Sequence, residues 1–284
     1  MTQIAIKIIK DIESMRRIED LQMEIWGMPE REVVPSHQLL AASGAGGAVL
    51  AALEPDGTMV GFCYGFAGWR DGRPLFYSHM AGVKAARQLR DIGFRLKCAQ
   101  REAAMAMGFD RAIWTFDPLL SVNARFNLHK LGATARRYHV NYYGEMPDAL
   151  NRGLDSDRLE VDWALRSPRV VAATAGTPQT REWDHAPRAL ESVRHPLGAA
   201  PSQPNLTLAA SAILVEIPTD FTAIRQRDHN LGQAWRLASR EAFLHYLGRG
   251  YRAVDFLLHP EEPLRGEAER LRGMYVLVRE PDED

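Results

Sequence analysis

A group of basic and polar residues stands where one predicted strand ends and a helix is about to begin. The stretch VKAARQLRDIGFRLK (83–97) carries Arg87, Gln88 and Arg90 at this junction. The first backbone N–H groups of a helix lack intrahelical partners, and the helix dipole adds partial positive charge. Such a junction suits a phosphate or pyrophosphate, and arginine side chains add charge to it. The alternative is a helix that simply starts with solvated arginines.

A histidine precedes this junction on the strand that leads into it. Strand alternation in LFYSHMAGV (75–83) predicts one face with Tyr77, His79, Ala81 and Val83, and the opposite face with Ser78 and Met80. Histidine is the side chain whose ordinary pKa lies nearest neutrality, so His79 is suited to general-base chemistry. The alternative is a strand histidine whose ring is satisfied by a neighbouring carbonyl.

The composition is that of an ordinary globular protein with a net charge near zero. Its 284 residues allow one large domain or two modest ones, with 46% hydrophobic and 25% charged residues. The formal net charge of −1 gives no basic field, so we expect no nucleic-acid partner.

The cysteines and the lengths of the apolar runs bear on the compartment in which the protein is expected. Cys63 and Cys98 make neither a disulfide framework nor a metal-ligand spacing, so we interpret both as buried thiols in a reducing, cytoplasmic compartment, with no metal site. The N-terminus lacks a secretory pattern, and no apolar run approaches the roughly 20 residues that span a bilayer. We therefore expect no membrane partner.

Apolar periodicity predicts the elements that must position these residues. Strands are expected at 3–10, 48–55, 59–69, 75–83, 111–116, 135–144, 158–166, 212–218, 252–258 and 273–280. Helices are expected at 12–26, 35–43, 92–107, 121–132 and about 220–250. The Asp-Gly pair at 56–57 predicts a hairpin between its flanking strands. Strands 75–83 and 111–116 bracket a helix, which places that helix N-terminus at a strand's carboxyl end, a usual site for anions.

This order predicts a mixed α/β (α+β) layer structure rather than a bundle or a sandwich. We expect a first domain over 1–166 and a Pro-rich irregular excursion over 167–209. A C-terminal α/β extension over 210–284 would pack on the first domain.

The junction and a later helix together resemble the GNAT superfamily of acyl-CoA-dependent N-acyltransferases, over roughly residues 3–165. The family's signature is a strand ending in Val, followed by Gln/Arg-x-x-Gly-x-Gly/Ala at a helix start, and here it matches Val83 and residues 88–93. NARFNLHKLGA (123–133) is similar to the family's Asn-rich helix ending in Leu-Gly. WTFDPL, NYYG and SDRLEVDW are similar to a subgroup of predicted acetyltransferases with a C-terminal extension.

The resemblance implies a mixed, mostly antiparallel central sheet with helices on both faces, and acetyl-CoA or another acyl-CoA as cofactor. The cofactor-binding residues that it implies are Ala81, Gly82, Val83, Gln88, Leu89, Arg90, Asp91, Ile92, Gly93 and Asn123. The small residues at 81 and 82 would let a pantetheine arm lie along the strand. Asn123 could equally cap its helix.

The sequence departs from the family at two functional positions. Asp91 stands where the first motif glycine is expected, which places a carboxylate near the diphosphate. Leu128 stands where a tyrosine often serves as general acid. These departures favour a non-catalytic acyl-CoA-binding or sensing protein as an alternative to an enzyme.

Amide formation from a thioester needs a base for the ammonium and an acid for the leaving thiolate. The resemblance implies His79 as the base, and we predict Tyr138 or Tyr142, on strand 135–144, as the acid. Asp117, Glu24 and Trp26 are the candidates for acceptor binding, although Asp117 could merely form the Asp-Pro turn and the tyrosines could simply pack.

The sequence therefore predicts transfer of an acyl group, acetyl by default, from acyl-CoA to a small-molecule amine or amino acid by direct attack on the thioester. An amino-acid N-succinyltransferase is a further alternative, and a homodimer is left open.

Overall fold

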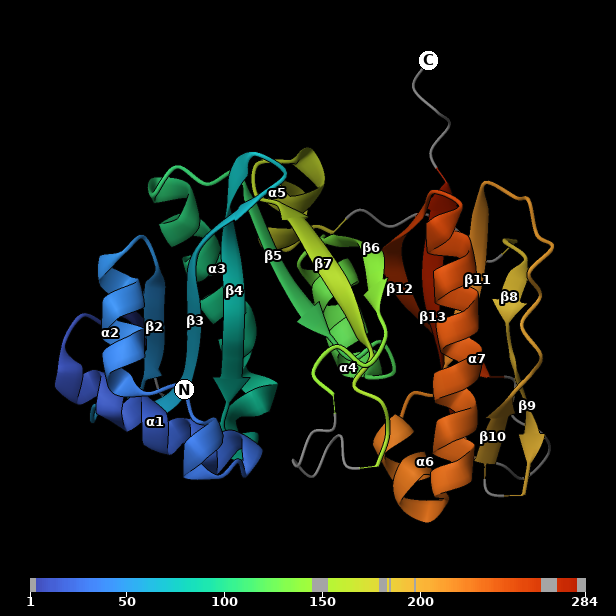
Figure 1. Cartoon of the computed structure of the whole chain (residues 1–284), viewed down its shortest axis with the longest axis horizontal. Helices are drawn as coiled ribbons and strands as arrows, with labels where there is room; N and C mark the ends of the chain where they lie inside the picture. The colour runs from blue at the N-terminus through green and yellow to red at the C-terminus, as the bar shows by residue number, and fades with distance from the viewer. Residues whose placement is uncertain are drawn as a thin grey trace. The chain divides into compact units, whose positions relative to one another are not determined.

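The computed structural model describes residues 4–144, 153–178, 183, 185–196, 198–261 and 270–279. The chain forms two compact units (Figure 1). The first comprises Met1–Trp114 and Trp163–Ser167, and the second comprises Thr115–Asp162 and Pro168–Asp284. The chain passes from one unit to the other after Trp114, after Asp162 and after Ser167, and each unit is described by itself.

The elements of the first unit follow the predicted order closely. They are β1 Ala5–Ile8, α1 Ile12–Trp26, η1 Glu30–Glu32, α2 Ser36–Gly44, β2 Ala48–Leu53, β3 Met59–Arg70, β4 Arg73–Val83, η2 Ala85–Arg90, α3 Ile92–Ala106 and β5 Arg111–Phe116. Strands β1 to β4 pair antiparallel in sequence order, and β5 pairs parallel to β4. The predicted hairpin at 56–57 is confirmed, with Gly57 at φ +85°.

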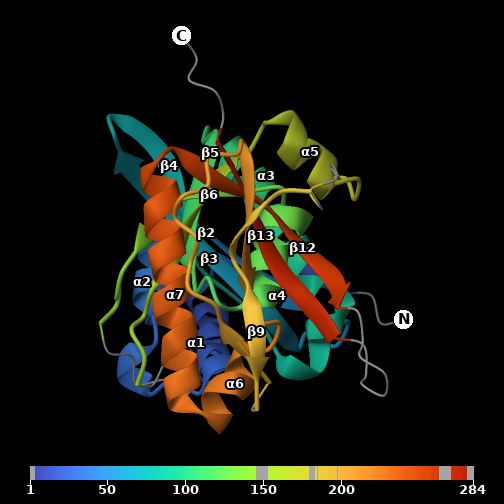
Figure 2. The ribbon, with the colours of Figure 1, turned by 90° about the vertical axis from the view of Figure 1, so that its right-hand side faces the viewer.

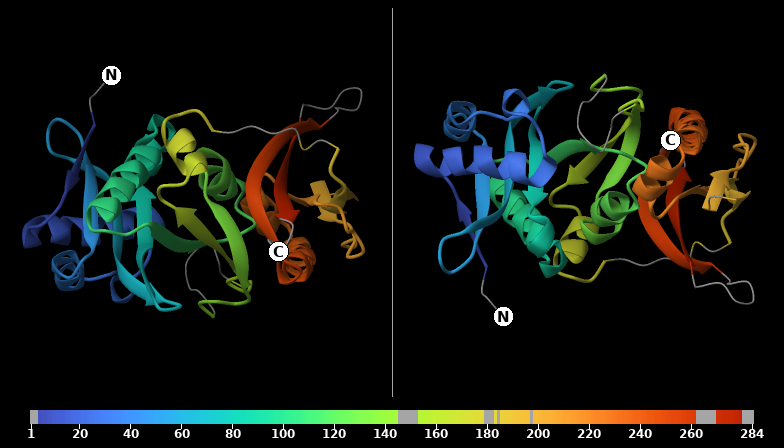
Figure 3. Two further views of the ribbon diagram at one scale, coloured as in Figure 1. Left: turned by 90° about the horizontal axis from the view of Figure 1, so that it is seen from above. Right: turned by 90° about the horizontal axis from the view of Figure 1, so that it is seen from below.

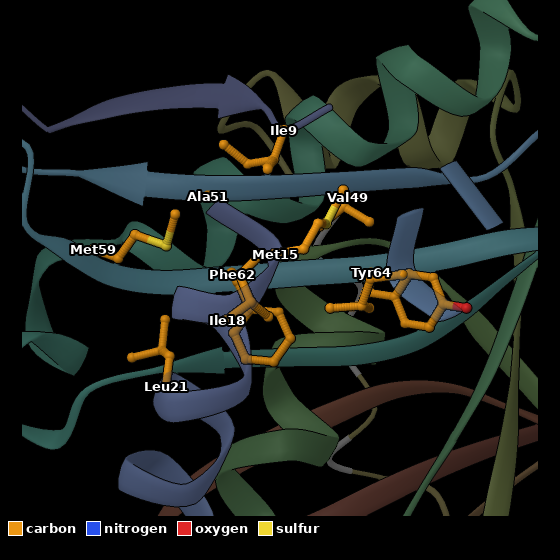
Figure 4. Packing of buried hydrophobic residues seen from close by; sticks show 10 residues of the cluster. Ile9, Met15, Ile18, Leu21, Val49, Ala51, Met59, Phe62 and Tyr64 are labelled. Carbon is orange, nitrogen blue, oxygen red and sulfur yellow. The ribbon is translucent and has the colours of Figure 1, made fainter. Parts of the chain in front are cut away.

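One face of this sheet is covered by α1 and α2 through an apolar cluster. Phe62 of β3 is fully buried together with Met15 and Ile18 of α1 (Figure 4). Leu39 of α2 belongs to the same cluster. The spacing of the α1 residues gives the helix one apolar stripe, which burial against the strands stabilises by roughly 1.5–3 kcal/mol for each large side chain.

Helix α3 covers the opposite face. Cys63 follows Phe62 in β3, so its side chain points the other way, and its thiol donates to the carbonyl of Leu96 in α3 at 3.6 Å. Figure 3 shows α1 and α3 on opposite sides of β2–β4. The prediction of a mostly antiparallel mixed sheet with helices on both faces is confirmed.

The strands of the second unit pair in the order β7-β6-β12-β13-β11-β8, and among their described pairings only β11–β8 is parallel. Its elements are α4 Ser121–Ala124, η3 Arg125–Lys130, β6 Thr134–His139, β7 Arg158–Ala164, α5 Pro168–Thr174, β8 Arg188–Leu190, β9 Ser192–His195, β10 Gly198–Pro201, β11 Ala212–Ile217, α6 Phe221–Arg227, α7 His229–Gly248, β12 Tyr251–Glu261 and β13 Arg270–Arg279. Figure 2 shows α7 running beside strands of this unit. None of the helices in the described ranges is long and apolar enough to cross a membrane.

Three predicted elements of the second unit differ from the structure. The strand expected over 135–144 ends at His139, because the chain turns there and Asn141 takes a left-handed φ of +47°. The helix expected over 220–250 is two helices, since Asp228 is extended and caps α7 by accepting from the Leu231 N–H at 3.1 Å. The stretch 121–132 is α4 followed by a π-helical segment.

The segment 167–209, expected to be irregular, contains α5 and β8–β10 within its described residues. The boundaries of the two compact units fall after residues 114, 162 and 167, whereas the predicted domain boundaries fall after residues 166 and 209. The predicted division into residues 1–166, 167–209 and 210–284 stays a prediction.

A buried ion pair links α7 to the turn that follows β5. The Nη1 and Nη2 atoms of Arg236 donate to the two carboxylate oxygens of Asp117 at 2.9 and 2.6 Å. Both residues are nearly inaccessible to solvent, and the Leu119 N–H also donates to Asp117. A buried pair of this kind is destabilising when one partner alone is removed, since the other charge remains desolvated.

We expect Asp117→Ala to lower the free energy of unfolding by about 3–5 kcal/mol, because it removes the carboxylate that is hydrogen-bonded to the buried Arg236 guanidinium. Denaturant unfolding measures the effect. The double variant Asp117→Ala/Arg236→Met should recover most of the loss, because it removes the buried guanidinium as well. A single variant as stable as wild type would contradict this account.

Candidate functional site

Strand β4 carries a β-bulge at the predicted base. Met80 pairs with Tyr64 of β3 and Ser78 pairs with Gly65, so His79 is the extra residue with no partner opposite. A bulge of this kind turns two consecutive side chains to one face and bends the strand. The alternation predicted for 75–83 is therefore wrong across residue 79: Met80 packs in the α1-side cluster, while Ser78 points to α3.

Aromatic rings surround His79 on the α1 side of the sheet. Its ring lies 5.9 Å from that of Tyr64, 6.0 Å from Phe66 and 6.2 Å from Tyr77, measured between centroids. His79 is nevertheless exposed to solvent. Desolvation by the surrounding protein lowers the pKa of His79 below its ordinary value, so the ring is neutral at pH 7 and able to accept a proton.

Strands β4 and β5 part just before this point. Their described pairing consists of Phe76 with Ala112 and Tyr77 with Ile113. Strand β4 continues to Val83 without further pairing to β5. The β5-facing edge of β4 from residue 78 onward is therefore not covered by β5, and an extended ligand could pair with it as another strand would.

Beyond β4 the chain makes the corner that the sequence predicted to bind an anion. The 3₁₀ segment η2 ends at Arg90, Asp91 adopts a left-handed φ of +56°, and α3 begins at Ile92. The predicted helix start is confirmed. The carboxylate of Asp91 makes no capping hydrogen bond to the helix, and a left-handed residue at this position explains why a glycine suits the motif.

The side chains at the corner are engaged in different ways. Arg87 donates from Nε to Glu54 Oε1 at 2.9 Å, so this guanidinium is held by the protein. The side chains of the predicted cofactor residues Gln88, Leu89 and Arg90 lie outside the described part of the structure. Their backbone belongs to η2.

Two predicted acceptor residues lie against the end of β4. A Cβ on Gly82 would come within 2.8 Å of the Trp26 ring, so the glycine lets the ring pack directly on the strand. Trp26 also makes an edge contact with Phe62 at 5.6 Å. Glu24 forms an ion pair with Lys84, with 2.6 Å between Oε2 and Nζ. The structure thus brings Glu24 and Trp26 to residues 82–84, at the strand end that leads into the corner.

The other predicted site residues belong to the second unit. Asn123 is exposed in α4, and Leu128 is fully buried. Asp117 is held by Arg236, so a cationic acceptor would have to compete for both of its oxygens.

The two predicted acids have different surroundings. Tyr138 donates to Asp157 Oδ2 at 2.7 Å and stacks on Phe243 at 5.6 Å. Burial, and then the negative charge of Asp157, raise the pKa of Tyr138 well above its ordinary value. Tyr142 is exposed in the turn after β6 and lies on no strand face, contrary to the predicted alternation.

Sequence analysis missed a buried lysine on α3. Lys97 is 3% exposed, and its Nζ donates to Ser78 Oγ at 2.8 Å and to Gln100 Oε1 at 2.9 Å. The ammonium also lies 3.7 Å from the centroid of the Trp114 ring. Desolvation lowers the pKa of Lys97 to about 7. Its helical position next to the apolar Leu96 was the available signal, but such a lysine is ordinarily solvated.

The described residues contain no group of three or more His, Cys, Asp or Glu side chains that could hold a metal ion.

Solved structures similar to this chain were found, but no family model and no curated protein matches its sequence. A candidate acetyltransferase of the GNAT family from Desulfovibrio desulfuricans is 14% identical with a TM-score of 0.46, over 57% of this chain and 99% of that one. A candidate acetyltransferase from Salmonella typhimurium, solved with acetyl-CoA, is 18% identical with a TM-score of 0.45, over 58% and 96%. An aminoglycoside 6′-acetyltransferase is 17% identical with a TM-score of 0.45, over 57% and 98%. Each is described as an acetyltransferase, and the first is placed in the family that the sequence resembles.

We expect the Lys97→Met variant to be more stable than wild type near neutral pH, and the gap to close as the pH rises. Below pH 7 both states of the wild type bind the proton, and the cost of burying the ammonium is complete. Between pH 7 and the ordinary lysine value of 10.5 only the unfolded state binds it, so wild-type stability rises by up to about 1.4 kcal/mol per pH unit. Denaturant unfolding from pH 6 to 10 measures this. A pH-independent gap would contradict the buried, shifted lysine.

Proposed function

We propose that the chain transfers an acyl group, acetyl by default, from an acyl-CoA thioester to the amine of a small molecule. The observation that carries the proposal is the junction of three features in one unit: a bulged strand presenting His79, an edge of that strand not covered by β5, and a helix start with a left-handed residue. The GNAT resemblance of the sequence assigns these same positions to thioester, pantetheine and diphosphate.

The residues present fit an acyl-CoA in most respects. The backbone edge of β4 from residue 78 would pair with the pantetheine amides. On the α1 side of this strand, the space that a side chain at residue 82 would need is filled by the Trp26 ring. The first amides of α3 would bind the diphosphate. When bound, acyl-CoA supplies the activated acyl group and the thiolate leaving group.

The protein's own groups would then manage the protons. His79, whose lowered pKa favours the neutral ring, would take a proton from the acceptor's ammonium, directly or through a water, so that the amine can attack. Of the two predicted acids, we favour Tyr142 for protonating the thiolate. The phenol of Tyr138 already donates to Asp157, and its raised pKa makes it a poorer acid.

Acceptor recognition is proposed for Glu24 and Trp26, whose contacts place them at the end of β4. The Glu24 carboxylate would attract a cationic amine while it also pairs with Lys84. Trp26 offers an apolar ring face on which a cation can lie. Asp117 is a weaker proposal, because Arg236 holds both of its oxygens. Asn123 is exposed within α4 and does not cap this helix, whose N-cap is Leu120. It stays a proposed pantetheine contact.

A second candidate is a protein that binds acyl-CoA without turning it over. Leu128, at the position of the family's tyrosine acid, is fully buried and cannot donate a proton. Calorimetric binding of acetyl-CoA together with a thiol-release assay over a panel of amines separates the two. Binding without turnover supports this second candidate, and the absence of both overturns the two together.

We expect His79→Ala to lower turnover by about 10²-fold or more while leaving the Kd for CoA near wild type, because the general base acts on the acceptor and not on the cofactor. Thiol release under saturating substrates measures the rate, and His245→Ala on α7 serves as the control histidine. An unchanged rate in His79→Ala would remove this residue from the mechanism.

We expect Asp91→Gly to bind CoA roughly 5- to 10-fold more tightly. A carboxylate about 4 Å from a phosphate costs about 1 kcal/mol in water, and the substitution removes it while relieving the left-handed strain. Asp91→Asn is the matched control, since it removes the charge and keeps a side chain that tolerates this conformation. Calorimetry measures all three proteins. Unchanged or weaker binding by both variants would show that the diphosphate does not lie at this corner.

A further inference from the structure

We infer that Lys97 is a positioning residue for the proposed base: together with Ser78 and Gln100 it holds the β4 bulge that presents His79, at the point where β4 and β5 part. The inference rests on the role proposed for His79. It concerns a cluster on the α3 face of the sheet, opposite to the face on which the imidazole lies.

Three side chains form a closed set of hydrogen bonds in this cluster. Ser78 Oγ donates to Gln100 Oε1 at 2.7 Å, and Lys97 Nζ donates to both of these oxygens at 2.8 and 2.9 Å. The orientation of the Gln100 amide is fixed, because an ammonium has no acceptor and must face the oxygen. The Gln100 Nε2 atom has no hydrogen-bond partner, so the cluster is rich in donors and depends on the two shared oxygens.

The cluster sits at the fork of the two strands. The last paired residues are Tyr77 and Ile113, and the next residues along each strand are Ser78 and Trp114. Lys97 contacts both: it donates to Ser78, and its Nζ lies over the Trp114 ring at 3.7 Å. One ammonium therefore links α3 to β4 and β5 where their backbones cease to hold one another.

This link accounts for the bulge. In a regular strand Ser78 and Met80 would point to the same face. Here Ser78 is held on the α3 face by Lys97 and Gln100, whereas Met80 packs on the α1 face. Both contacts can be kept only if one extra residue is inserted between them, and that residue is His79. Loss of the polar anchor would let Ser78 and the imidazole shift.

Packing alone does not require an amine at position 97. A methionine has nearly the same length and would fill the same volume without the desolvation cost of a buried charge. Among the described residues, no carboxylate makes a hydrogen bond with Nζ. The groups facing it are Cys63 from β3 and Cys98 and Gln100 from α3, with Ser78, Trp114 and the Trp163 ring at 5.3 Å completing the surroundings. The charge-assisted hydrogen bond to Ser78 is what the lysine adds.

The first test reads the imidazole directly and needs no substrate. In Lys97→Met, NMR titration of the His79 ring should give a pKa closer to the ordinary 6.5, since a relaxed bulge would move the ring away from the aromatic side chains that desolvate it. Lys7→Met, at an exposed lysine of β1, should leave the titration unchanged. A Lys97→Met protein that folds and titrates at His79 as wild type does would overturn the inference.

The second test uses turnover. Lys97→Met should lower kcat by about 10- to 100-fold and leave the KM for acyl-CoA little changed. A displacement of a reacting group by about 1 Å has an effect of this size. The advantage of wild type over this variant should decline as the pH rises through about 7, where Lys97 loses its proton. In Gln100→Glu an added carboxylate should move this decline upward by about one pH unit or more.

The outcomes separate this inference from the proposed function. A wild-type protein without acyl transfer overturns the function, and the NMR titration still decides whether Lys97 places His79. A wild type that turns over, with a Lys97→Met variant equal in kcat and in its pH profile, overturns the inference and leaves the function standing. A Lys97→Met protein that fails to fold would also contradict it, because a methionine should fill the same volume without the cost of burying a charge.

Discussion

Strand β4 is anchored on both of its faces, and the candidate site depends on this constraint. On one face Ser78 is bound by α3, and on the other Met80 is packed into the cluster built on α1. The two contacts are out of phase with a regular strand, so the strand accommodates them by bulging at His79. A polar contact and an apolar contact thus set the backbone that carries the proposed base.

The same region of the strand separates from β5, and this has a consequence for binding. A sheet edge within a fold is normally covered, because uncovered N–H and C=O groups attract another strand. Here the edge lies between a general-base candidate and the start of a helix. A long ligand with amides in its middle and a diphosphate at one end matches that order of features, and acyl-CoA has this order.

Sequence reasoning predicted the order of elements well because the signals are local. Hydrophobic spacing defined α1 and α3, the Asp-Gly pair defined the β2–β3 hairpin, and the corner at Asp91 was placed to the residue. The bulge was missed, since one inserted residue leaves no mark in an alternating strand. The break at Asp228 and the end of β6 were missed because capping and a left-handed asparagine compete with propensity over single residues.

Long-range polar contacts were beyond prediction for a different reason. Asp117 and Arg236 are 119 positions apart in the chain, and nothing near either residue identifies its partner. Lys97 and Ser78 are closer in sequence, but a lysine on a helix is ordinarily placed in solvent, and only the fold shows that Trp114 covers it. Long-range polar contacts of this kind therefore leave no local signal in the sequence.

Backbone hydrogen exchange with and without acetyl-CoA tests the central claim most directly, because the claim concerns amides. The account predicts that the cofactor slows exchange at residues 88–94 and along β4 from 79 to 83, while the β1–β2 pair is unaffected. Acetyl-CoA that leaves the exchange of these amides unchanged, or that protects another part of the chain instead, would contradict it.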